Sequence, residues 1–203
     1  ISGGAVFSEV VATSYDVTGI RGTPIVMVSV TGAGSKLDLS SVETLKVGYP
    51  YEWGSESFEA RDGGVIDFSG LKLIEDQGRS DYTTSFIKTG GGDILFPILE
   101  EIRSTSDGQT EFADEGGAPF IFPALKAVAR GTFDVESGER RVFPSIQTLS
   151  GTTFSVGSGG ELDLPFLASM SGSLTIQSGG VVNAPSLTSL TWGVVTVDGS
   201  GQF

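Results

Sequence analysis

Carboxylates and aromatic rings are the side chains of this chain that could do chemistry, because the sequence contains no histidine and no cysteine. That absence excludes Ser-His-Asp and Cys-His nucleophilic catalysis, together with the usual zinc sites. The 30 glycines recur at turns and lack the strand-to-helix context of a phosphate-binding loop. The chemistry left open is a pair of carboxylates, with or without a cation, or binding by aromatic rings.

Two aspartates, Asp38 and Asp67, occupy the same position in consecutive repeats of the chain, and Asp163 and Asn183 do so further along. Stacked strands place such residues about 4.8 Å apart. Like charges at that distance favour a bound cation or protonation. Asp38 and Asp67 are thus candidate Ca²⁺ ligands, and no other cofactor is predicted. The alternative is that both are solvated carboxylates on a strand surface.

Three loops, at residues 46–56, 75–82 and 103–111, hold the residues by which the early repeats exceed the later ones. Stacked repeats would place these loops on one flank, and long loops on a rigid scaffold often carry binding sites. Aromatic rings can cover the C–H faces of sugars while polar neighbours bond the hydroxyls. The alternative is that the rings pack the loops onto the wall of the fold. The predicted ligand-binding residues are Tyr49, Tyr51, Trp53, Asp76, Arg79 and Tyr82.

Leu95, Ile121 and Val142 take the outward position of the aspartate column in the middle of the chain. A contiguous exposed apolar strip can mark a contact surface. We therefore name these three residues the aliphatic strip and predict an interface there. A local register change that buries the strip is the alternative.

The elements that position these residues come from an internal repeat, clearest in Gly151–Thr191. That segment reads GTTFSVGSGGELDLPFLASMS and then GSLTIQSGGVVNAPSLTSLT, one unit written twice. A unit of this size cannot bury its own apolar face, but stacked copies can. The proline of the unit marks equivalent positions back along the chain. The markers are Ser40, Ser69, Pro97, Pro123, Pro144, Pro165 and Pro185, at intervals of 29, 28, 26, 21, 21 and 20 residues.

Positions around each marker repeat the same residue types, which indicates one local fold for every unit. A glycine lies six residues before each marker, where a turn needs positive φ. Ten of the phenylalanines fall at positions predicted to face inward, so we assign them to stacked internal ladders. They are Phe58, Phe68, Phe86, Phe96, Phe112, Phe120, Phe122, Phe133, Phe143 and Phe154.

The repeat predicts an all-β fold, a right-handed parallel β-helix (β-solenoid) of about seven coils of 20–29 residues. Residues 1–33 fit the repeat badly and are predicted to be two N-terminal strands or a cap, joined by the turn-rich segment 16–24. Residues 34–203 are predicted to form one continuous β-solenoid domain, with its C-terminal end within a coil. A single helical turn after each proline is the alternative, but flanking glycines leave little room for it, so almost no α-helix is expected.

Arg141 breaks the pattern, because the other units have an apolar residue at its position. Either the strand slips locally there, or the aliphatic part of the arginine side chain stays inside while its guanidinium reaches solvent.

Charge and hydropathy exclude further classes of partner. The net charge is −13 without a basic stripe, which argues against nucleic acid and anionic membranes. No apolar run approaches the roughly 18 residues of a membrane span, and no signal peptide is visible at the first residues.

The segments Ser35–Leu45 and Leu162–Met170 resemble the β-solenoid repeats of very large bacterial extracellular proteins of planctomycete type. They are more loosely similar to receptor L-domains and leucine-rich repeats. The resemblance covers about residues 34–203. It implies the fold and an extracellular or cell-surface location, and it carries over no catalytic residue.

Three functions follow from these observations. The first is a non-enzymatic structural or adhesive segment of an exported bacterial surface protein, whose partners are cell-surface or matrix components and neighbouring repeats of a longer parent chain. The second is a β-helix that binds carbohydrate, or cleaves polysaccharide as a lyase or hydrolase. The third is a protein-recognition module that uses the aliphatic strip or an open end.

Overall fold

The structure is a computed structural model that describes residues 1–203 except 9, 19–23, 52 and 116–117. The described residues form strands and no helix, which confirms the all-β class. The strands are β1 (Val6–Phe7), β2 (Ser14–Asp16), β3 (Ile25–Thr31), β4 (Lys36–Asp38), β5 (Thr44–Val47), β6 (Gly54–Arg61), β7 (Val65–Asp67), β8 (Leu73–Asp76), β9 (Tyr82–Thr89), β10 (Asp93–Leu95), β11 (Glu101–Ser104), β12 (Gln109–Glu115), β13 (Ala127–Ala129), β14 (Gly131–Val135), β15 (Arg140–Val142), β16 (Thr148–Val156), β17 (Glu161–Asp163), β18 (Ser169–Ile176), β19 (Val181–Asn183) and β20 (Ser189–Val197).

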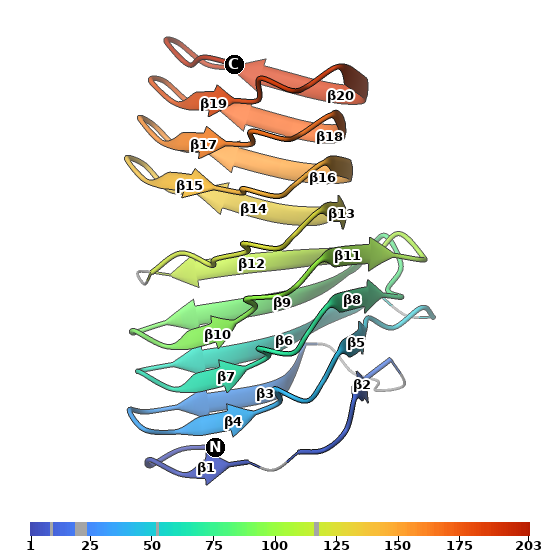
Figure 1. Ribbon diagram of the computed structural model, residues 1–203, viewed down its shortest axis with the longest axis vertical. Helices are drawn as coiled ribbons and strands as arrows, with labels where there is room; N and C mark the ends of the chain where they lie inside the picture. Colours follow the sequence, from blue (N-terminus) through green and yellow to red (C-terminus); the bar gives the residue numbers. More distant parts are fainter. Residues whose placement is uncertain (9, 19–23, 52, 116–117) are drawn as a thin grey trace.

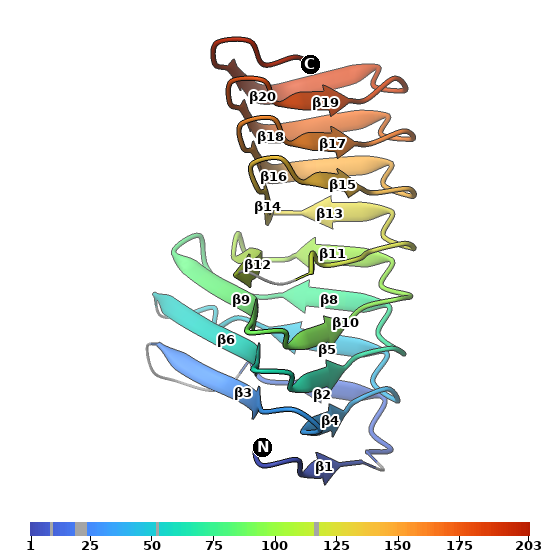
Figure 2. The ribbon, with the colours of Figure 1, turned by 90° about the vertical axis from the view of Figure 1, so that its left-hand side faces the viewer.

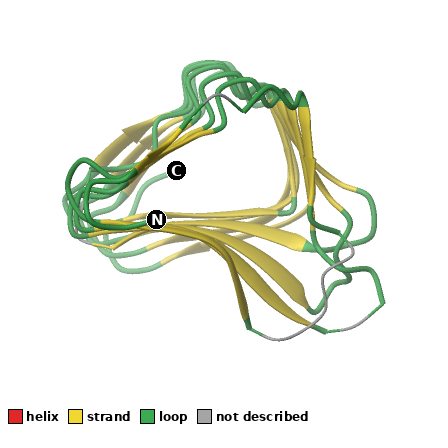
Figure 3. Cartoon of the chain, turned by 90° about the horizontal axis from the view of Figure 1, so that it is seen from below, coloured by secondary structure: helices red, strands yellow, loops and turns green. Residues whose placement is uncertain are grey.

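Parallel pairing between equivalent strands of successive units builds the molecule. One sheet has the order β1-β4-β7-β10, and another has the order β15-β17-β19. The large sheet follows the path β2-β5-β8-β11-β13-β16-β14-β12-β9-β6-β3, and β18 and β20 extend it from β16. The units are stacked along the long axis, from the N-terminal end to the C-terminal end (Figures 1 and 2). Seen along that axis, the strands lie on three sides of a shared interior (Figure 3).

Alternation of apolar and polar residues decides which side chains enter this interior. In β9 every second residue is buried, beginning with Tyr82. Successive side chains of a strand point to opposite faces, so one face of each strand packs inside and the other meets solvent. The residues two positions after each marker are buried as the repeat requires, except the partly buried Leu187.

Phenylalanine rings form two ladders inside the stack. In the first ladder, Phe58, Phe86, Phe112, Phe133 and Phe154 stack with ring centroids 5.1 to 5.2 Å apart. In the second, Phe68, Phe96, Phe122 and Phe143 stack at 5.7 to 6.0 Å. Rings of one ladder meet rings of the other edge to face, as between Phe133 and Phe143. Both arrangements are favourable for aromatic quadrupoles, and the predicted inward columns are confirmed.

The glycine column has the backbone conformation that the repeat requires. Its described members have φ between 69° and 81°, a region that residues with a Cβ rarely adopt. Gly117, the remaining member, lies outside the described residues.

The first 33 residues contain three strands where two were predicted. Strand β1 pairs with β4, β2 with β5, and β3 with β6, all in parallel. The N-terminal segment therefore stacks onto the next unit by the same pairing that joins later units. Residues 19–23 of the predicted turn-rich connection lie outside the described residues.

One side of the stack is interrupted in its middle. Strand β10 ends one short sheet and β15 ends the other, and the described residues 118–123 between them form no strand. Pro119 and Pro123 have no N–H to donate to a ladder. The N–H of Phe120 donates to the Asp114 carboxylate at 3.1 Å instead. This interruption lies at the position of the aliphatic strip.

Candidate functional site

Of the six predicted ligand-binding residues on the long loops, three are exposed to solvent and three are buried. Tyr51 and Trp53 are 76% and 69% exposed, and Arg79 is half-exposed beside Asp81. Tyr49, Tyr82 and Asp76 are buried, so these three side chains offer no open platform. The loops themselves do lie on one flank, after β5, β8 and β11 (Figure 1). Residue 52 of the first loop lies outside the described residues.

Two buried carboxylates organise the inner side of this flank. Glu56 Oε1 accepts hydrogen bonds from the Gly48 N–H at 2.7 Å and from the Thr84 hydroxyl at 3.0 Å. Asp76 Oδ1 accepts from the Gly78 N–H at 2.7 Å, and Oδ2 accepts from the Thr110 hydroxyl at 3.2 Å. The carboxylates thereby fix the backbone of two of the long loops.

Burial controls the titration of this acid cluster, which we define as Glu56, Asp76 and Tyr82. Burial raises the pKa of Asp76 to about 6, against the opposing hydrogen bonds from Gly78 and Thr110. It also raises the pKa of Glu56 and of Tyr82. A carboxyl group that titrates near neutral pH can move a proton. Glu56 and Asp76 are buried, however, and neither lines one of the hollows described below, so a solvent-borne substrate does not meet their oxygens in this conformation.

The candidate calcium ligands already have a cation between them. Lys36 Nζ lies 2.7 Å from Asp67 Oδ2 and 3.8 Å from Asp38 Oδ2. Burial alone would raise the pKa of Asp67, but the bonds from Lys36 and Ser69 outweigh it and lower that pKa. The Ser40 side chain and N–H lower the pKa of Asp38. The like-charge problem is therefore met by an ammonium group, and the described residues hold no group of three or more carboxylates arranged for a metal ion.

The second predicted stack, Asp163 beside Asn183, forms between β17 and β19 and is also held by polar contacts. Asn183 Nδ2 donates to Asp163 Oδ1 at 2.7 Å, and Arg140 donates to Asp163 Oδ2 at 2.6 Å. Both contacts join residues of neighbouring units at the surface. They stabilise stacking and leave no carboxylate pair for acid–base chemistry.

The aliphatic strip faces outward without a register slip. Ile121 is 72% exposed, Val142 is also exposed, and Leu95 is partly buried. Strand β15 keeps its register with β17, so that Val142 pairs with Asp163. Leu95 and Ile121 line the same hollow of about 340 Å³, whereas Val142 lines a separate one.

We call the hollow of about 340 Å³ the wall groove, because it lies where residues 118–123 interrupt the side of the stack. Its wall is mostly aliphatic, with proline rings and one phenylalanine, and its two charged members are Lys88 and Asp93. The lining residues are Lys88, Asp93, Ile94, Leu95, Phe96, Pro97, Ala118, Pro119, Ile121 and Pro123.

Lys88 is the unusual residue of the wall groove, because it is 2% exposed. Its Nζ lies 3.2 Å from Asp93 Oδ1 and 4.4 Å from the centroid of the Phe120 ring. A buried ammonium is tolerated only with such compensation. Lys88 takes an inward position at the end of β9, a placement that could have been read from the alternation of that strand.

Both outcomes predicted for Arg141, a local strand slip or an outward guanidinium, are wrong. Arg141 keeps its register with Leu162 and remains inside. Its Nη2 lies 2.7 Å from Asp114 Oδ2 and 2.9 Å from Glu139 Oε1. Asp114 is buried as well. The acidic partner, distant in sequence, makes the inward arginine stable.

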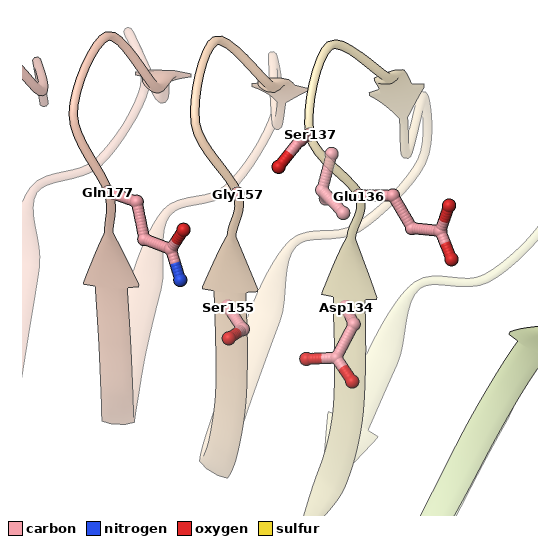
Figure 4. Close-up of a pocket in the computed structure, with 7 residues that line it drawn as sticks. Asp134, Glu136, Ser137, Ser155, Gly157 and Gln177 are labelled. Atoms are coloured by element: carbon pink, nitrogen blue, oxygen red, sulfur yellow. The ribbon is translucent and has the colours of Figure 1, made fainter.

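A polar hollow of about 430 Å³ lies at the ends of β14, β16 and β18 (Figure 4). Asp134 and Ser155 project from adjacent strands, and Gln177 follows the third strand. Glu136 and Ser137 also line it, together with Val135 and Gly157. These side chains can hydrogen-bond a polar molecule at the surface. Sequence reasoning did not single them out, although the stacked column of Asp134 and Ser155 could have revealed them.

Among the described residues, no helix has the length and apolarity needed to span a membrane. Neither a family model, nor a curated protein, nor a solved structure matches the chain.

Proposed function

We propose that the chain is a right-handed parallel β-helix of about seven coils and serves as a structural, adhesive segment of an exported bacterial surface protein. The observation that supports it best is the continuity of stacking. The Phe58–Phe154 ladder passes through five units with nearly constant spacing. In such a repeat each unit is stabilised by the same contacts with its neighbours, as an extended structural segment requires.

The coil interpretation follows from the connections between the sheets. Each unit except the one marked by Pro123 supplies a short strand before its marker, and every unit supplies further strands after it. The pairings that join these strands between neighbouring units are parallel. Parallel strands joined by crossovers are nearly always right-handed. The partners of the segment would be cell-surface or matrix components and neighbouring repeats of a longer parent chain.

An antibody against the purified chain tests the surface location. We expect it to label intact cells of the source organism without permeabilisation. An antibody against a cytoplasmic protein of the same cells is the control. Labelling that requires permeabilisation would overturn the surface assignment.

Carbohydrate binding is the second candidate, favoured by the exposed rings of Tyr51 and Trp53 on one loop. Tyr51 also contacts the buried Tyr49 edge to face, with centroids 5.6 Å apart, which anchors the pair. A glycan array tests this function, and Trp53→Ala should abolish any hit. Phe166→Ala is the matched control, because Phe166 is an exposed ring elsewhere on the surface. Equal loss in both variants, or no hit for the unmodified chain, would remove this candidate.

A further inference from the structure

We propose that the wall groove is a binding site for an apolar monocarboxylate, which places its carboxylate on Lys88 and its hydrocarbon body against Leu95 and Ile121. The inference concerns the interrupted side of the stack and is independent of the structural role proposed above. It follows from a buried cation, an aliphatic wall and an opening to solvent in one place.

The cation is the specific feature of the site. Lys88 lines the groove, yet it is nearly removed from solvent. An ammonium group carries three donors, and among the described residues Lys88 donates one hydrogen bond, to Asp93 at 3.2 Å. Two N–H donors of Lys88 therefore have no hydrogen-bond partner in the part of the chain that the structure describes. An ion pair formed at Lys88 is stronger than at the surface, because the surroundings are poor in water.

Asp93 does not cancel this capacity. Its Oδ1 is shared between Lys88 and the N–H of Ile94, which donates at 3.0 Å. Its side chain is half-exposed, whereas that of Lys88 is buried. The Asp93 charge is thus partly hydrated, while the Lys88 charge is buried. Asp114, which pairs with Lys88 across β12 and β9, has Arg141 as its own cation. An incoming carboxylate therefore competes for Lys88 with Asp93.

The wall of the groove selects for an apolar body. Leu95 and Ile121 supply aliphatic surface, and Pro97, Pro119 and Pro123 add rigid rings without N–H donors. The volume of about 340 Å³ is at the small end of ligand sites in proteins. A short acyl chain fits such a space, whereas a sugar would leave its hydroxyls without partners along this wall.

The overall charge of the chain is unfavourable for binding an anion. At a net charge of −13, the chain repels anions in general. An anion that binds must therefore be held by a local site, and the groove provides one through Lys88.

Octanoate, octanamide and octylamine are the probes, titrated into the full chain and followed by two-dimensional NMR. We expect octanoate to shift resonances of residues 88–97 and 118–123, and to bind at least tenfold more tightly than the amide or the amine. Lys88→Met should weaken octanoate binding at least tenfold. Comparable affinity for octanamide, tighter binding of octylamine, or no binding of octanoate would overturn the proposal.

Ile121→Asp tests the site without disturbing a buried residue, because Ile121 is exposed. The added carboxylate should reduce octanoate affinity at least tenfold in a variant whose circular dichroism is unchanged. Val142→Asp is the matched control, since Val142 is an exposed member of the same strip outside the groove. Equal octanoate affinity in Ile121→Asp and the unmodified chain would contradict the site, even if Lys88→Met fails to fold.

Discussion

Arg141 and Asp114 form a buried ion pair inside the stack, with Nη2 2.7 Å from Oδ2. The two residues lie on different strands, β15 and β12, and are 27 residues apart in sequence. The Asp114 carboxylate also accepts the N–H of Phe120. The pair therefore ties the interrupted side of the stack to its large sheet.

Arg141→Met leaves Asp114 without its cation, and should lower the free energy of unfolding by about 3–5 kcal/mol. Urea denaturation measures this. Arg140→Met is the control, because the adjacent arginine forms its ion pairs at the surface, where solvent screens them and their loss changes stability little. Replacing both Arg141 and Asp114 by apolar residues should recover part of the loss. Equal effects of the two single arginine variants would show that the buried pair has no special role.

Phe133→Ala removes a ring from the middle of the first ladder and should cost about 3–5 kcal/mol of stability. Phe133 stacks on Phe112 and Phe154 and is fully buried. Phe166→Ala, at an exposed ring, should change stability by less than about 0.5 kcal/mol. Thermal unfolding of both variants measures the difference, and an unchanged melting curve for Phe133→Ala would place that column outside the core.

Stability should fall as the pH rises from about 4 to 7 through the contribution of Asp76. Its pKa is raised from 3.8 to about 6 in the folded state, so the folded chain binds more protons than the unfolded chain between these values. The contribution is present below pH 4 and lost as pH passes 6. A shift of this size corresponds to about 3 kcal/mol.

Asp76→Asn isolates this contribution, because the amide cannot ionise. The difference in unfolding free energy between the variant and the unmodified chain should change with pH in the direction just given. Asp81→Asn, at an exposed loop residue, serves as the control. A pH-independent difference for Asp76→Asn would show that Asp76 does not titrate with a raised pKa.

Trp53→Ala and Tyr82→Ala separate the two parts of the predicted aromatic surface. Trp53 is exposed, so its loss should change stability by less than about 0.5 kcal/mol. Tyr82 is buried against Glu56, so its loss should cost about 3 kcal/mol. A large effect of Trp53→Ala would assign that ring to loop packing and remove it from ligand binding.

Short-period patterns made most of the fold predictable. The column of Phe112, Phe133 and Phe154 has a two-residue alternation on each side, and the glycines mark the turns, so the strands and the inward faces follow from local sequence. The position of Asp163 beside Asn183 was predictable for the same reason, since register follows from the repeat.

Apart from Lys88, whose inward position follows from the alternation of β9, the buried charged residues were not predictable, because partners such as Asp114 for Arg141 and Thr110 for Asp76 come from other units. Arg141 looks like an error in an apolar column until Asp114 is placed opposite it. Asp76 and Tyr82 look like exposed loop residues until the Gly78 N–H and Glu56 are seen to bond them inside. Contacts between residues distant in sequence determine that these side chains are buried, and the local sequence pattern does not indicate such contacts.

Spin-label distances along one outward column test the stacking most directly, because the chain has no cysteine of its own. Ser57, Thr153, Ser173 and Val194 belong to one register column, which passes through Ser85, Glu111 and Thr132. Pairs of introduced cysteines join Ser57 to each of the other three. We expect separations of about 19, 24 and 29 Å, because each stacked unit adds about 4.8 Å. Distances that do not increase from pair to pair by one strand spacing would contradict the stack.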